Sequence, residues 1–93
     1  MDETPLRVYG TLWCGDCVRT RHFLRRHKVP FEFINIDADH AGEKLVQQVN
    51  HGLRSVPTIF FPDGSLLVEP SNAQLAEKLG IAAPPSSPAP NSG

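Results

Sequence analysis

The sequence predicts a small α/β domain in which three helices flank a mixed four-stranded sheet, in the order β-α-β-α-β-β-α. Three observations predict it. A short apolar run leads into a proline-free basic segment, an aromatic-rich run leads into a capped helix, and a Pro-Asp-Gly turn joins two further short runs. The first β-α-β unit is expected to be a right-handed parallel crossover and the last two strands an antiparallel hairpin, so the sheet is mixed.

The first half of the chain predicts two strands separated by a helix. Residues 6–9 form a short strand that Gly10 ends, residues 15–28 a helix, and residues 31–36 a second strand rich in Phe and Ile. Val18 is expected off the buried face of the helix, and Phe23 with it. That face is predicted to carry residues spaced i, i+3 and i+7: Cys17, Thr20 and Leu24.

The second half predicts a helix, a hairpin and a last helix. Asp39 is the expected N-cap of a helix over residues 40–50, with Gly52 just past its end. The turn at Pro62-Asp63-Gly64 joins strands over residues 56–61 and 65–69. Ser71 and Gln74 form a capping box for the last helix, and Gly80 stops it.

Composition sets the broad class of the protein. The 93 residues make one small domain, expected over residues 1–81, while residues 82–93 hold four prolines and no large apolar side chain and predict a disordered tail. A net charge of −1 argues against a general nucleic-acid binder, and no apolar run is long enough to span a membrane. Residues 1–4 are acidic and show no signal-peptide pattern, and a lone CxxC in such a chain is typical of cytosolic redox chemistry, so a cytoplasmic protein is expected. It is also expected to be a monomer.

The two cysteines lie at the predicted start of the first helix. The unpaired N–H groups and the dipole at a helix N-terminus favour an anion, so Cys14 is expected to ionise more readily than a free cysteine. Cys17 falls in the first turn, near enough for the Cα separation of about 4.4–6.8 Å that a disulfide requires. One cysteine can therefore attack a disulfide and the other can close the bond behind it.

Neighbouring residues offer a metal site as an alternative to redox chemistry. Cys14, Cys17, His22 and His27 have a spacing close to that of a zinc knuckle. Steps of five residues on a helix rotate side chains by about 140°, so these ligands cannot converge on one ion if the segment is helical. The sequence therefore predicts exposed histidines and no metal site.

Charged residues also surround the cysteine pair. Five of the nine positive charges fall within residues 19–28, and most are expected on a solvated helix face. Arg19 and Arg21 are the nearest to the thiols and are candidates to stabilise the thiolate or to meet an anionic substrate. Asp16 acts in the opposite sense, because a carboxylate beside Cys14 disfavours its thiolate.

These features together resemble a glutaredoxin of the thioredoxin fold, over about residues 5–80. Within that family, the order and spacing of five motifs are similar to those of the mycoredoxins, which reduce mixed disulfides with mycothiol. The motifs are Trp13-Cys14-Gly15-Asp16-Cys17, Val49-Asn50-His51-Gly52, Arg54-Ser55-Val56-Pro57-Thr58, Asp63-Gly64-Ser65 and Glu69-Pro70-Ser71.

The sequence departs from this resemblance in two places. Glutathione-using glutaredoxins carry a Gly-Gly-x-Asp-Asp-like segment before the last helix, and related electron donors to ribonucleotide reductase a Trp-Ser-Gly-Phe-like one. Here that place reads Glu69-Pro70-Ser71-Asn72. An aromatic residue is common in the family where this chain has Asp16.

The resemblance implies a thiol-disulfide oxidoreductase with no organic cofactor. Cys14 attacks a mixed disulfide between a protein and a low-molecular-weight thiol, and either a second thiol molecule or Cys17 releases it. The resemblance also implies a cis bond between Val56 and Pro57 facing the cysteines. The expected substrate-binding residues are Trp13, Arg54, Ser55, Val56, Pro57 and Ser71.

Three alternatives remain open from the sequence. Glutaredoxins with Gly after the first cysteine sometimes hold an iron-sulfur cluster between two subunits, and a CxxC protein can also be a general dithiol reductase of protein disulfides. The chain could instead be a non-catalytic binding module that offers its Pro-rich tail to a partner.

Overall fold

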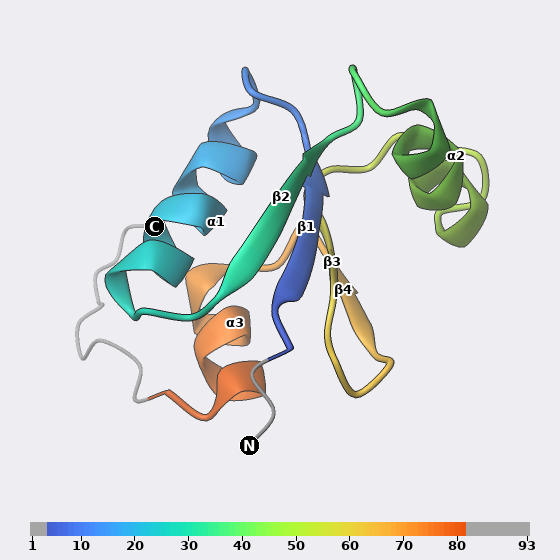
Figure 1. Cartoon of the computed structure of the whole chain (residues 1–93). Coiled ribbons are helices and arrows are strands. Elements are labelled where there is room, and N and C mark those ends of the chain that lie inside the picture. The colour runs from blue at the N-terminus through green and yellow to red at the C-terminus, as the bar shows by residue number, and fades with distance from the viewer. Residues whose placement is uncertain (1–3, 82–93) are drawn as a thin grey trace.

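The computed structural model describes residues 4–81, and its elements follow the predicted order (Figure 1). The strands are β1 (Leu6–Gly10), β2 (Phe31–Asn35), β3 (Thr58–Phe60) and β4 (Leu66–Val68). The helices are α1 (Gly15–Arg26), α2 (His40–Val49) and α3 (Asn72–Leu79). The predicted tail over residues 82–93 lies outside the described residues.

The four strands form one mixed sheet in the order β2-β1-β3-β4. β1 pairs in parallel with β2 and antiparallel with β3, so that Val8 lies between Phe33 and Ile59. β3 and β4 form the predicted antiparallel hairpin. At its turn the carboxylate of Asp63 accepts hydrogen bonds from the backbone N–H and the hydroxyl of Ser65, at 2.9 and 2.6 Å.

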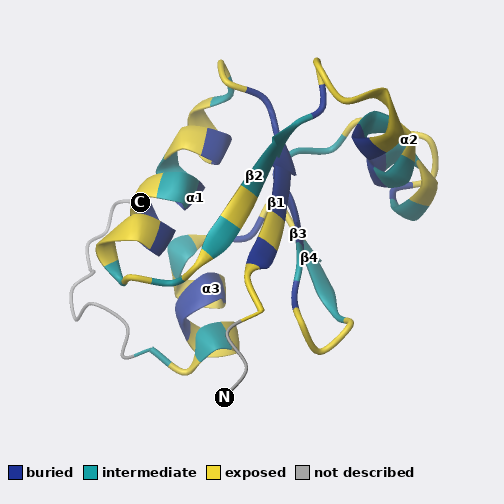
Figure 2. Ribbon diagram, in the orientation of Figure 1, coloured by how far each residue is buried: buried dark blue, intermediate teal, exposed yellow. Residues whose placement is uncertain are grey.

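The helices cover the two faces of this sheet unequally. α1 and α3 lie on one face and α2 on the other (Figure 1). Alternation along β1 divides the core, because Leu6 and Val8 point toward α1 and α3 while Tyr9 packs with Val46 of α2. The buried residues of Figure 2 therefore form two layers, one on each side of β1.

Several of the predicted helices and strands are too long. α1 ends at Arg26 rather than at residue 28, because Lys28 takes a φ of 56° and the N–H of Val29 bonds back to the carbonyl of Leu24 at 2.9 Å. The second strand ends at Asn35 rather than at residue 36, and α2 ends at Val49 rather than at residue 50. The last two strands are also shorter at both ends than predicted.

The predicted buried face of α1 was too narrow. Cys17, Thr20 and Leu24 are buried as expected, but Phe23 is buried too, with 5% of its surface exposed. Phe23 packs in the cluster that includes Leu75 of α3. A second helix therefore covers a side of α1 that lies outside the predicted stripe of buried residues.

The predicted helix caps are confirmed. The Asp39 carboxylate accepts the backbone N–H of Gly42 at 3.0 Å and begins α2. Ser71 and Gln74 form both hydrogen bonds of the capping box of α3, and Gly80 ends that helix in the left-handed region, with a φ of 72°.

Candidate active site

Both cysteines lie at the start of α1, shortly after β1 ends. Cys14 is the N-cap of α1 in an extended conformation, and its carbonyl accepts the N–H of Val18 at 3.0 Å. Its side chain is partly exposed, whereas Cys17, one turn into the helix, is fully buried. The two thiols are free and hydrogen-bonded to each other. The predicted strand-turn-helix placement of the pair is therefore confirmed.

Burial decides the protonation state of Cys17. The pKa of this thiol is raised to about 11, first because burial removes water from around it and then because of the hydrogen bond and negative charge of Cys14. A backbone hydrogen bond from Thr11 and the positive charge of Arg21 act in the opposite direction. Cys17 is thus a protonated thiol at neutral pH, placed beside the more exposed Cys14.

Gly10 makes room for the buried thiol. A Cβ atom at this position would lie 2.5 Å from the Cys17 Sγ and 3.3 Å from the Phe33 Cε1. The sequence indicated Gly10 only as the residue that ends a strand, but it is the last residue of β1 and forms the wall against which Cys17 packs. No local signal distinguishes this role from an ordinary strand end.

A buried hydrogen-bond network holds the segment before β3. The peptide bond between Val56 and Pro57 is cis, as the family resemblance implied. Just before it, the carbonyl of Ser55 accepts the hydroxyl of Thr58 at 2.7 Å, and that hydroxyl oxygen accepts Nδ2 of Asn50 at 3.2 Å. Asn50 and Thr58 were not among the predicted site residues; an Asn at the end of an amphipathic helix was the available signal.

A second network joins Trp13 to Arg54 across the surface. The indole N–H of Trp13 donates to the Asp37 carboxylate at 3.0 Å, and Arg54 contacts the same carboxylate at 2.6 Å and Glu43 at 2.9 Å. Trp13 remains 73% exposed. The two residues predicted to bind substrate thus share one acidic partner, Asp37, which sequence reasoning did not single out.

This network predicts a titration that the single Trp can report. The Trp13 indole N–H, and then Arg54, lower the pKa of Asp37 below its ordinary value of 3.8. Because the folded pKa is depressed, the contact is complete above that value and is lost as pH falls through the folded pKa. We expect a Trp13 fluorescence transition centred below pH 3.8.

The matched variant for this titration is Asp37→Asn, which keeps the side-chain shape and cannot ionise. It should lack the transition while retaining the fluorescence change of global acid unfolding. A transition that persists in the variant would show that another group controls the Trp13 environment.

The two arginines nearest the thiols have different partners. Arg19 reaches α3, where its Nη1 donates to Asn72 Oδ1 at 2.7 Å and its Nη2 to the Pro70 carbonyl at 3.2 Å; Asp16 lies 3.5 Å away. The guanidinium of Arg21 instead lies 4.3 Å from the centre of the Phe33 ring. Of these two arginines, Arg21 is the one whose charge acts on the buried Cys17 thiol.

Ser71, another predicted substrate-binding residue, uses its hydroxyl and its N–H to cap α3. Its hydroxyl accepts the N–H of Gln74 at 3.1 Å, and its own N–H donates to the Gln74 side chain at 2.8 Å. The adjoining Pro70 carbonyl accepts a hydrogen bond from Arg19. The Ser71 hydroxyl and the N–H groups of Ser71 and Gln74 are therefore already engaged.

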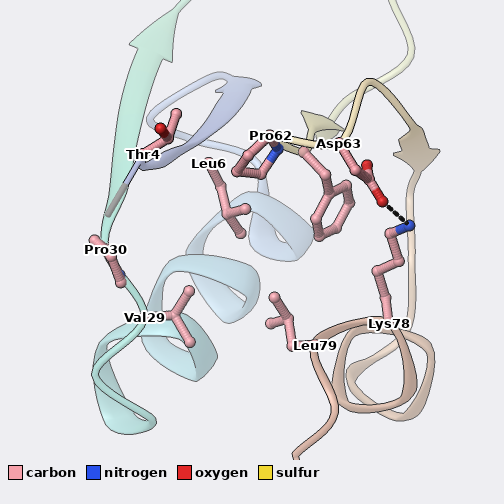
Figure 3. A pocket seen from close by; sticks show the side chains of 9 residues that line it. Thr4, Leu6, Val29, Pro30, Pro62, Asp63, Lys78 and Leu79 are labelled. Atoms are coloured by element: carbon pink, nitrogen blue, oxygen red, sulfur yellow. Dashed lines mark hydrogen bonds and ion pairs between the residues drawn. The ribbon is translucent and has the colours of Figure 1, made fainter. Parts of the chain in front are cut away.

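A pocket lies at the other end of the sheet from the cysteines (Figure 3). Its volume is about 350 Å³, its walls include Leu6, Val29 and Leu79, and the ion pair of Lys78 with Asp63, at 2.9 Å, lies on its rim. None of the predicted site residues lines it. Over residues 4–81, no group of three or more His, Cys, Asp and Glu residues could hold a metal ion, and no helix could cross a membrane.

Comparison with known proteins bears on the chemistry of this site. The sequence matches the family Glutaredoxin over residues 6–67. It is 38% identical over 79 residues to a protein of Mycobacterium tuberculosis that carries a provisional glutaredoxin name, covering 85% of this chain and 94% of the relative. It is 31% identical over 72 residues to Mycoredoxin 1 of Corynebacterium glutamicum, covering 77% of this chain and 89% of that protein.

The fold is shared with solved structures. The crystal structure of a point mutant of a thioredoxin-like protein superposes with a TM-score of 0.74 at 24% identity, covering 85% of this chain and 99% of that one. The fold is thus thioredoxin-like, as the resemblance implied. With the family match and the two thiols at the start of α1, the chain belongs to the glutaredoxin family of thiol-disulfide oxidoreductases.

Proposed function

We propose that this protein reduces mixed disulfides between proteins and a low-molecular-weight thiol, with a mycothiol-type thiol preferred. The Cys14 thiolate attacks the sulfur of the small thiol, the bond to the substrate protein breaks, and the protein sulfur leaves with the electron pair. A second thiol molecule, as its thiolate, then attacks the small-thiol sulfur of the adduct, so that the disulfide of two small thiols forms and the Cys14 thiolate is released. The reaction requires no resident cofactor.

The observation that carries this proposal is the unequal exposure of the two thiols. Cys14 is partly exposed at a helix start that favours an anion, whereas the buried Cys17 has a pKa raised to about 11. The first attack therefore belongs to Cys14. Cys17 can act only after Cys14 has formed its adduct.

The choice of small thiol is supported by the start of α3. Glutathione carries two carboxylates, which require cationic or N–H donors, whereas mycothiol has a sugar-inositol body. Here the N–H of Ser71 is used by Gln74, Arg19 is bound to Asn72, and Glu69 is an exposed negative charge. This surface suits a neutral hydroxyl-rich ligand better than a carboxylate.

We therefore expect the mycothiol adduct of a substrate protein to be reduced with a kcat/KM on the order of tenfold higher than the glutathione adduct of the same protein. Using one protein with either thiol attached leaves the small thiol as the only difference. Equal or faster reduction of the glutathione adduct would contradict the preference and leave the broader oxidoreductase activity in place.

Charge reversal at the start of α3 tests the physical reason for the preference. Glu69→Lys should raise kcat/KM for the glutathione adduct more than for the mycothiol adduct, because it supplies a cation for a carboxylate. Glu77→Lys makes the same charge change at an exposed position on the same helix and is the matched control. An equal effect of both variants would indicate a general charge effect.

The proposal includes the setting in which the enzyme works. We expect a cytoplasmic monomer that acts on S-thiolated proteins and leaves nucleic acids unbound. Visible absorbance after anaerobic purification would instead favour an iron-sulfur carrier.

A further inference from the structure

The surroundings of Cys17 contain one charged group besides the other thiol. The groups of the described residues that act on this buried thiol are Cys14, the backbone N–H of Thr11 and the guanidinium of Arg21. The strand residues packed beside it, Gly10 and Phe33, carry no charge. Arg21 is therefore the only cation that acts on the Cys17 sulfur within residues 4–81.

The position of Arg21 is fixed by α1 and β2. It follows Cys17 by four residues on α1, so the two side chains lie on the same side of the helix. Its guanidinium carbon lies 4.3 Å from the centre of the Phe33 ring. The Phe33 ring also lies near Cys17. A Cβ atom built at Gly10 would be close to both the Phe33 Cε1 and the Cys17 Sγ.

The charge of Arg21 is not neutralised by a carboxylate. None of the ion pairs within residues 4–81 includes Arg21, and its buried Nε has no hydrogen-bond partner there. Arg19, by contrast, lies 3.5 Å from Asp16 and is bound to Asn72. The ring holds the Arg21 cation in place, and none of the ion pairs within residues 4–81 offsets its charge toward the buried thiol.

We propose that Arg21 is a positioning residue for the second half of the reaction, in which its guanidinium favours the Cys17 thiolate and speeds closure of the Cys14–Cys17 disulfide. The inference rests on the proposed attack by Cys14, which forms the adduct that Cys17 resolves. While Cys14 is a thiolate, its charge opposes ionisation of Cys17 in addition to burial; once Cys14 is in a disulfide, that charge is gone and Arg21 acts against burial alone.

The closure step balances within the enzyme and its adduct. Cys17 loses its proton, and its sulfur attacks Cys14 Sγ. The new sulfur–sulfur bond forms as the bond from Cys14 to the small thiol breaks. The departing sulfur keeps the electron pair and takes up the proton, so the small thiol is reduced as the dithiol is oxidised.

The test follows one turnover of the full chain. The reduced protein is mixed with bis(2-hydroxyethyl) disulfide, an uncharged probe that Arg21 cannot attract, quenched with acid, and analysed by intact mass. The hydroxyethyl adduct on Cys14 and the closed disulfide have different masses, so adduct formation and closure are timed separately in the same sample.

Arg21→Met keeps an apolar contact for Phe33 and removes the charge. If the Cys17 pKa rises by about one unit, the thiolate fraction falls tenfold while its nucleophilicity rises roughly threefold, so closure should slow by about threefold per unit. Adduct formation should slow by less than closure. Arg21→Lys retains the charge and should recover most of the closure rate.

Arg25→Met is the matched control, because Arg25 lies over the Phe31 ring at 5.8 Å, one helical turn farther along α1. It also loses a cation and a ring contact and should close at the wild-type rate. Thermal unfolding of each variant checks that it is folded, and Arg21→Gln is the second neutral variant if the Met variant is not.

Each outcome decides a different claim. Slower closure in both neutral Arg21 variants, with recovery in the Lys variant, supports the inference. Unchanged closure, or an equal loss in Arg25→Met, overturns it and leaves the proposed function standing. If the wild-type protein forms no adduct on Cys14, the proposed function itself fails.

Discussion

Replacing Cys14 by serine should lower kcat/KM for a protein mixed disulfide by at least about 1,000-fold, whereas replacing Cys17 by serine should leave substantial activity. A serine hydroxyl is not ionised at neutral pH, and Cys17 is fully buried and protonated, so it cannot take over the attack. An excess of the small thiol can release the Cys14 adduct when Cys17 is absent.

The measurement compares both variants with the wild type at saturating small thiol, using the same S-thiolated substrate. Alkylation of Cys14 in the Cys17 variant serves as a control for an intact, exposed nucleophile. Equal loss in the two variants would contradict the monothiol route and would favour the general dithiol mechanism, in which Cys17 is needed for every turnover.

Replacing Gly10 by alanine should destabilise the protein by about 1–3 kcal/mol, because it overpacks a closed part of the core. The added methyl group would lie 2.5 Å from the Cys17 Sγ, and that sulfur is fully buried. Relief requires the Cys17 side chain to rotate or α1 to shift, and the Phe33 Cε1, 3.3 Å from the same position, restricts the space. Urea unfolding at neutral pH under reducing conditions measures the loss.

A double-mutant cycle assigns the cause of that loss. Combining Gly10→Ala with Cys17→Ala removes the sulfur and should recover on the order of 1 kcal/mol relative to additive effects. Gly15→Ala is the control, since a Cβ there has no atom within 4 Å and alanine favours a helix over glycine. Strict additivity of the two substitutions would mean that the sulfur is not the obstacle.

The sequence correctly predicted the features that local signals encode. The capping box at Ser71, the N-cap at Asp39 and the Pro-Asp-Gly turn each involve residues within a few positions of one another, and all three form as predicted. The order of elements follows from these signals together with hydrophobic periodicity. The cis bond before Pro57 came from the family resemblance, since propensity alone favours trans.

Predictions from helical periodicity were less complete. The stripe through Cys17 and Leu24 faces the sheet as expected, but Phe23 is buried as well. Periodicity identifies the face of α1 that meets one neighbour. It contains no information about α3, which meets the same helix from another direction and is formed by residues about fifty positions later.

By itself, the sequence determined that two thiols lie at a helix start on an α/β sheet, because that arrangement is encoded by neighbouring residues. The sequence also predicted that Cys17 faces the core and Cys14 does the attack, but only the tertiary structure decided which groups surround the buried thiol. The wall at Gly10, the binding of Arg19 to Asn72 and the stacking of Arg21 on Phe33 join residues on separate elements. Arg19 and Asn72 are 53 positions apart, and packing alone brings them together. Which arginine keeps a free charge for the buried thiol therefore depends on where α1 meets β2 and α3.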